Sequence, residues 1–106
     1  MNLGRVRELL SSGRIALRFG DHAFVEARKD GLTTADLRAS CECGETIEDY
    51  GVRALLLHFT PDDRLPYHIV VEYVAGARYL TVVTAYIPDA KEWERDWKTR
   101  RRQRRR

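Results

Sequence analysis

The sequence predicts an α+β domain in which helices pack on one face of a small antiparallel sheet and a C-terminal helix closes the chain. Three observations predict this class. Apolar residues recur at helical spacing in the first part of the chain, they alternate with a period of two from residue 47 to residue 87, and the links between the alternating segments are short. Short links favour antiparallel neighbours, because parallel strands need long crossover connections.

The first helix and the first strand follow from local pattern. The helix has one apolar face, formed by Leu3, Val6, Leu9 and Leu10. The turn-forming residues 11–13 end it, and residues 14–19 then alternate polar with apolar side chains. This alternation predicts a short strand that stops at Gly20.

Two more helices are predicted before the main run of strands. Asp21 is placed to cap a helix that opens at His22 and stops at Gly31, since glycine favours helix C-termini. A threonine at position 33 or 34 can cap a third helix, which we expect to reach about Ser40.

After Gly44 the pattern predicts three or four strands, at Ile47 and over residues 52–59, 67–74 and 79–87. The links at 60–64 and 75–77 are polar or contain glycine, so we expect an antiparallel meander. Pro88 ends the last strand. Trp93 and Trp97 stand four residues apart, and this spacing predicts a final helix over residues 89–98 that lays an aromatic edge on the sheet.

Length and composition indicate one globular domain, which we expect to span residues 1–97, followed by a basic tail over residues 98–106. No apolar run is long enough to span a membrane, and the N-terminus lacks the apolar core of a secretion signal, so we expect a cytoplasmic protein. Cys41 and Cys43 are too close for an unstrained disulfide and lack partners for a zinc site, so we expect reduced thiols and no metal or cofactor.

The charge is distributed very unevenly. Seven Lys and Arg residues and no acidic residue lie in the last nine positions, whereas the first 97 residues carry 12 Lys and Arg against 16 Asp and Glu, a formal net charge of −4. A cluster of positive charge attracts a nucleic-acid backbone or an acidic partner. A solvated end of the chain with no partner is the alternative.

Two histidines far apart in the sequence are the candidate catalytic pair. His is the side chain that can act as acid or base near neutral pH, and His22 and His68 are expected to come together. Thr84 and Tyr86 lie two apart on a predicted strand and therefore point the same way. From the length of the hairpin link we expect the residue opposite His68 to be Ala85 or Tyr86, so that His68 and Tyr86 can be cross-strand neighbours, and we expect Tyr86 to share its face with Leu80 and Val82.

Three stretches carry a resemblance to a known family. These are Asp21-His22-Ala23 at a helix start, residues 66–71 at a strand start, and residues 81–89 followed by Trp93 and an Arg-rich end. From Gly20 to about Arg102, the chain resembles the small bacterial family called domain of unknown function 4258, which is grouped with RelE-like and ParE-like toxins.

The resemblance implies a RelE-like toxin fold and the toxin of a type II toxin-antitoxin pair. Its partners would be RNA, such as mRNA, and a small antitoxin protein. The chemistry such a fold runs is metal-independent RNA cleavage, in which the 2′-hydroxyl attacks the phosphorus. Under this hypothesis His22 and His68 are base and acid, Thr84 and Tyr86 bind the scissile phosphate, Arg100 and Arg101 hold the RNA backbone, and Glu26 orients His22.

Other interpretations stay open at this point. The protein can be a non-catalytic interaction module with a toxin-like fold, as in ParE-like relatives that inhibit DNA gyrase, or a nucleic-acid-binding domain that acts through its basic tail. His58 stands among Leu55, Leu56, Leu57 and Phe59, which favours a partly buried histidine over a third catalytic group. The sequence does not define an oligomeric state.

Overall fold

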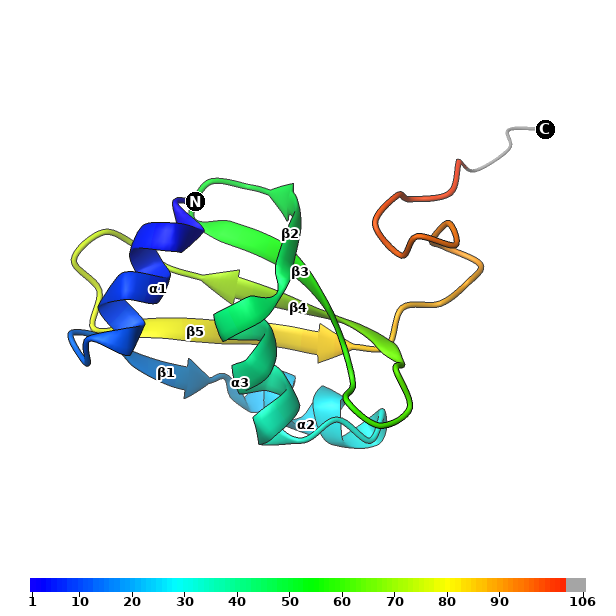
Figure 1. The fold of residues 1–106 in the computed structure, drawn as a ribbon, viewed down its shortest axis with the longest axis horizontal. Coiled ribbons are helices and arrows are strands. Elements are labelled where there is room, and N and C mark those ends of the chain that lie inside the picture. The colour runs from blue at the N-terminus through cyan, green and yellow to red at the C-terminus, as the bar shows by residue number, and fades with distance from the viewer. Residues whose placement is uncertain (103–106) are drawn as a thin grey trace.

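The computed structural model describes residues 1–102 and contains three helices and five strands (Figure 1). In chain order these are α1 (Leu3–Ser11), β1 (Ala16–Phe19), α2 (Asp21–Lys29), α3 (Thr34–Cys43), β2 (Glu45–Asp49), β3 (Arg53–Phe59), β4 (Pro66–Glu72) and β5 (Tyr79–Tyr86). The helices and strands predicted before residue 88 are all present, with bounds that differ by a few residues. The α+β class is therefore correct, and two features of the predicted arrangement are wrong.

The sheet is mixed and not purely antiparallel. Its strand order is β1-β5-β4-β3-β2, in which β2 to β5 form the expected antiparallel meander and β1 pairs with β5 in parallel. Between β1 and β5 the chain passes through two helices and three strands. This long connection lets β1 reach the outer edge of β5 in the same direction, which the short links could not predict.

A β-bulge in β5 decides which side chains share a face. The register pairs Val70 with Thr84 and then Val71 with Val82, so that Val83 has no partner in β4. An extra residue shifts the alternation by one position. The prediction that Leu80 and Val82 share a face with Tyr86 is therefore wrong: Leu80 and Val82 enter the helix-side core, and Thr84 and Tyr86 point to the opposite face.

The main core lies between the helices and one face of the sheet. Figure 1 shows α1 and α3 in front of the sheet and α2 below β5 and β1. Ala23 and Ala27 of α2 are buried in the same cluster as Tyr67, Ile69 and Val71 of β4. Small residues on α2 allow this helix to approach β5 closely, and Gly20 accordingly donates a hydrogen bond to the carbonyl of Val82.

Helix α3 is closed at both ends by specific contacts. Thr33 and Asp36 form a capping box at its start. At its end the Arg7 guanidinium of α1 donates hydrogen bonds to the carbonyls of Cys41 and Gly44, at 2.8 and 2.7 Å. A Cβ atom at Gly44 would lie 2.6 Å from the Ser40 carbonyl oxygen, so glycine is required where α3 turns into β2.

The predicted C-terminal helix over residues 89–98 does not form. The C-terminal arm, residues 88–102, is instead a compact irregular segment that lies beside the sheet on the side away from α1 and α3 (Figure 1). The Asp89 carboxylate accepts the backbone N–H of Lys91, and the Asp96 carboxylate accepts those of Lys98 and Thr99. Side chains that bond nearby backbone groups compete with helix formation, and this local competition outweighs the i, i+4 spacing of the tryptophans.

The boundary expected between residues 97 and 98 does not mark the end of the folded body. Lys98 forms an ion pair with Glu45 at 2.8 Å, and Arg100 forms one with Glu48 at 2.9 Å. The first part of the expected basic tail therefore packs on β2. The last part, residues 103–106, lies outside the described residues. Within residues 1–102, no helix has the length and apolar character needed to cross a membrane.

The close packing of α2 gives a test of the core. We expect Ala23→Leu to lower the free energy of unfolding by about 1–3 kcal/mol, because Ala23 is fully buried and the added atoms overpack the interface with β5. The matched control is Ala35→Leu on the exposed side of α3, which should change it by less than about 0.5 kcal/mol. Urea denaturation measures both. Equal effects would contradict the packing described here.

Candidate functional site

His68 is the most deeply buried ionisable residue on the arm side of the sheet. Its exposed fraction is 0%, and its ring makes edge contacts with Trp93 and Tyr86, at centroid distances of 4.5 and 5.3 Å. Trp93 is itself only 1% exposed. The C-terminal arm thus closes over His68 and forms a second, smaller core on this face.

Both ring nitrogens of His68 are occupied. Nε2 lies 2.7 Å from the Trp97 carbonyl oxygen, which can only accept, so Nε2 carries the proton. Nδ1 lies 3.3 Å from the Tyr86 hydroxyl and accepts from it when the ring is neutral. Burial lowers the pKa of His68, despite opposing contributions from the Trp97 carbonyl and the Glu48 charge. His68 is therefore neutral at pH 7 and holds the arm in place.

The predicted pairing of His68 with Tyr86 is confirmed, because the two residues are directly opposite in the β4–β5 register. Tyr86 is partly buried, and burial raises the pKa of its phenol, with Arg100 acting in the opposite direction. Thr84 lies on the same face, opposite Val70. Thr84, Tyr86 and His68 therefore share one face, as expected. His68 is buried against Tyr86, however, and is not open to solvent.

His22 is not brought to this cluster. It is exposed on α2, whose buried side packs into the core on the helix face, whereas His68 points to the arm face. In residues 1–102 no hydrogen bond or ring contact joins His22 to His68 or Tyr86. The Glu26 carboxylate binds Lys29 at 3.3 Å and does not orient His22. The expected convergence of the two imidazoles is therefore wrong.

A cluster that the sequence analysis missed lies next to Tyr86. Arg100 donates two hydrogen bonds to the Glu48 carboxylate, at 2.9 and 3.0 Å, and its guanidinium lies 4.6 Å above the Trp93 ring. The Tyr50 hydroxyl also donates to Glu48. The Arg100 hydrogen bond is the main cause that lowers the pKa of Glu48, which is therefore ionised at neutral pH. Only the spacing of two residues between Glu48, near the end of β2, and Tyr50, just after it, hinted that they share a face.

A basic pocket opens beside this cluster. Lys91, Glu92, Arg100, Arg101 and Arg102 line it, so four of its five residues are cationic. Arg101 is anchored to the arm, since its Nε donates to the carbonyls of Ala90 and Trp93 at 2.8 and 2.9 Å. The arm therefore holds Arg100 and Arg101 in fixed positions, where Arg100 pairs with Glu48 and Arg101 pairs with Glu94 at 3.2 Å. An anion such as a phosphate would bind here in exchange for these carboxylates.

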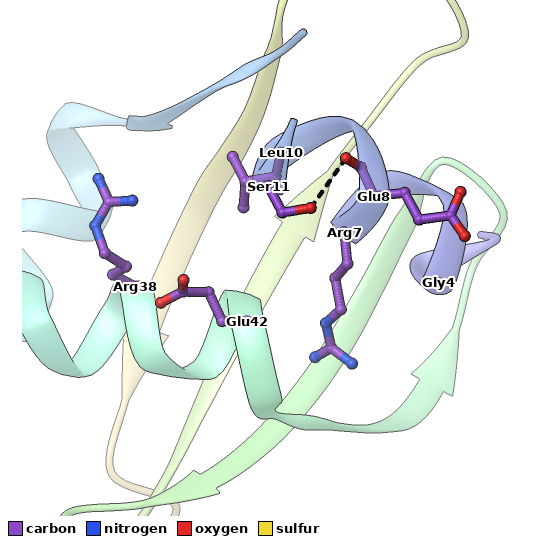
Figure 2. A pocket seen from close by; sticks show the side chains of 7 residues that line it. All are labelled: Gly4, Arg7, Glu8, Leu10, Ser11, Arg38 and Glu42. Atoms are coloured by element: carbon purple, nitrogen blue, oxygen red, sulfur yellow. Dashed lines mark hydrogen bonds between the residues drawn. The ribbon is translucent and has the colours of Figure 1, made fainter. Parts of the chain in front are cut away.

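A second pocket lies between α1 and α3 (Figure 2). Arg7 points from α1 toward the end of α3, where its guanidinium donates to the carbonyls of Cys41 and Gly44. The rest of the lining combines two acidic side chains with one further arginine, namely Glu8, Glu42 and Arg38. This mixed charge, with Arg7 committed to the fold, favours the arm side as the functional face.

Cys43 and His58 lie at a crevice between the end of β3 and the arm. Cys41 is buried, and burial raises the pKa of its thiol to about 12, whereas Cys43 is exposed. His58 is partly buried, as expected, and its Nδ1 lies 3.2 Å from the Tyr67 hydroxyl. His58, Cys43 and Trp97 all line a crevice at the end of β3.

Comparison with known proteins identifies the family. The family model described as Domain of unknown function (DUF4258) matches residues 19–87, which is more than half of the chain. The protein belongs to this family. The match begins at the last residue of β1 and covers α2 to β5, which include His22 and His68, but it does not cover the C-terminal arm. Neither the curated proteins nor the solved structures gave a match.

The buried neutral ring of His68 predicts a pH-dependent stability. The unfolded chain takes up a proton near pH 6.5 and the folded chain resists it, so the stabilisation by His68 is complete above that pH and is lost as the pH falls below it. We expect His68→Leu to lower the free energy of unfolding by about 1–3 kcal/mol at pH 7.5, because it leaves two buried polar groups unpaired. The difference from the wild type should narrow toward pH 5.

Urea denaturation at a series of pH values measures this difference. His22→Leu is the matched control, since His22 is exposed, and should change the free energy of unfolding at pH 7.5 by less than about 0.5 kcal/mol. A gap between the wild type and His68→Leu that stays constant from pH 7.5 to pH 5 would contradict a buried neutral histidine.

Proposed function

We propose that the protein is a toxin-like endoribonuclease that cleaves RNA without a metal ion, by attack of the 2′-hydroxyl on the phosphorus. The observation that carries this proposal is the position of the Glu48–Arg100 pair, beside Tyr50 and Tyr86 and next to the basic pocket of the arm. A carboxylate, a guanidinium and a phosphate-binding surface are the groups that this reaction requires. The family resemblance to RelE-like toxins supports the same reaction class.

The proposal gives each group one role. The Glu48 carboxylate accepts the proton of the 2′-hydroxyl, the 2′-oxygen forms a bond to phosphorus, and the bond from phosphorus to the 5′-oxygen breaks. The leaving oxygen takes a proton from water, and the products are a 2′,3′-cyclic phosphate and a 5′-hydroxyl. Arg100 leaves Glu48 to bind the phosphoryl oxygens, where the negative charge builds up.

His68 has a positioning role in this proposal. It binds the Tyr86 hydroxyl and the Trp97 carbonyl, so it sets the place of the arm that carries Arg100. His22 has no role in the reaction. As a toxin, the protein would be paired with an antitoxin whose acidic groups can cover the same cations.

The second candidate function is a non-catalytic RNA-binding module. One observation favours it: Arg100 holds Glu48 in a two-bond ion pair and lowers the pKa of its carboxyl, which weakens Glu48 as a base. In that case the cations of the arm bind the RNA backbone and no bond is broken.

Cleavage of single-stranded RNA in excess EDTA, with the ends analysed for 2′,3′-cyclic phosphate, distinguishes the two functions. We expect cleavage by the wild type and a loss of about 100-fold or more in Glu48→Gln and Arg100→Gln, since they remove the base and the phosphate-binding cation. The matched controls are Glu72→Gln and Arg53→Gln, which break a similar exposed ion pair (2.8 Å) elsewhere on the sheet. Their cleavage rates should equal that of the wild type.

RNA that is bound but stays intact under all conditions would favour the non-catalytic module. Equal losses of cleavage rate in the Glu48 and Glu72 variants would contradict the site, because breaking any ion pair on the sheet would then lower the rate.

A further inference from the structure

We propose that the crevice between the end of β3 and the C-terminal arm binds one nucleobase of single-stranded RNA. This inference rests on the proposed binding of RNA and names the part of the surface that reads a base. The crevice has a volume of about 570 Å³ and is lined by residues of β3, of the arm and of the α3–β2 junction. It lies outside the Glu48–Arg100 cluster.

The lining suits a flat aromatic ligand with a phosphate attached. Leu57, Phe59 and Trp97 provide apolar and aromatic surface. Arg95 and Lys98 provide two cations from the arm, beside the carboxylates of Glu45 and Asp96, and Lys98 pairs with Glu45 at 2.8 Å. Unstacked bases bind proteins by stacking on aromatic side chains while cations hold the neighbouring phosphates. The crevice combines both kinds of group in one place.

The end of β3 is open on the side of the crevice. Strand β2 begins at Glu45, which pairs with Leu57, so His58 and Phe59 extend beyond the first residue of β2. Their other neighbours are Tyr67 and Pro66 of β4. A ligand can therefore approach the last two residues of β3 from the β2 side.

The hydrogen bonds around His58 fix which ring nitrogen can face a ligand. The Tyr67 hydroxyl donates its only proton to the Asp36 carbonyl, which cannot donate in return. The same hydroxyl must then accept from His58 Nδ1, at 3.2 Å, so Nδ1 carries the proton of the neutral ring. Nε2 is left with its lone pair as a hydrogen-bond acceptor. His58 lies opposite Tyr67 and points to the helix side of the sheet, whereas Leu57 and Phe59 point to the arm side, so His58 lines the crevice at the open end of β3. An acceptor there selects a base with an N–H group, such as the amino group of adenine.

The wall formed by the arm is held in position by contacts on both sides of Trp97. His68 Nε2 donates to the Trp97 carbonyl at 2.7 Å, and the neighbouring Lys98 pairs with Glu45 at 2.8 Å. Trp97 has a φ angle of +61°, in the left-handed region that a bulky residue rarely adopts. A strained conformation kept in place by a buried histidine is typical of a residue that serves a site.

The test measures by anisotropy the binding of a fluorescein-labelled oligonucleotide that is abasic at its other positions, with 2′-fluoro groups throughout to prevent attack by the 2′-hydroxyl. One internal position carries adenine, unsubstituted purine or no base. We expect the adenine strand to bind about 5- to 100-fold more tightly than the strand with the missing base. We expect purine, which lacks the amino group, to bind about 2- to 10-fold more weakly than adenine.

His58→Ala should abolish the difference between adenine and purine, whereas the matched control His22→Ala should keep it. Lys98→Gln should weaken binding of all strands and reduce the dependence on salt, and Lys29→Gln, on α2, should not. Equal binding of the adenine and abasic strands, with salt-dependent affinity retained, would overturn the nucleobase site and leave the proposed function standing. Absence of binding to every strand would overturn both.

Discussion

The burial of Trp93 against His68 is the contact on which the arm side of the molecule depends. A five-stranded sheet with helices on one face leaves its other face to solvent unless another segment covers it. Here an irregular segment takes that place, and the indole of Trp93 is buried against the His68 ring. The Trp93 and Tyr86 rings contact the imidazole, and a backbone carbonyl of the arm accepts its hydrogen bond. The histidine therefore has a hydrogen-bond partner although it is buried.

This contact also decides the electrostatics of the surface. The body of the chain is acidic, and a polyanion would be repelled from most of it. Because the arm folds back, Arg100 and Lys98 reach Glu48 and Glu45 on β2, and the remaining cations line pockets on either side of the arm. The basic residues thus act from defined places on a folded surface. The family match ends before the arm, so the segment that carries this charge lies outside the matched region.

Sequence reasoning predicted part of the candidate site. The length of one hairpin link places Ala85 or Tyr86 opposite His68, because register in a hairpin is set locally, and the bulge at Val83 decides for Tyr86. The placement of Leu80 and Val82 failed at the bulge, where one extra residue reverses the faces. The meeting of His22 with His68 failed for a different reason: the side of the sheet that a helix covers is settled by long-range packing, which two sequence positions do not contain.

The sequence by itself determined the α+β class, the three N-terminal helices and the antiparallel meander of β2 to β5, since helical spacing, period-two alternation, capping residues and short links act within a few positions of the chain. Only the tertiary structure decided that β1 joins the sheet in parallel, that residues 88–102 form an arm and not a helix, and that His68 is enclosed. The pairing of β1 and the enclosure of His68 depend on contacts between distant segments, such as the hydrogen bond from His68 to the Trp97 carbonyl. The same contacts hold the arm against the sheet, while the local bonds of Asp89 and Asp96 compete with a helix.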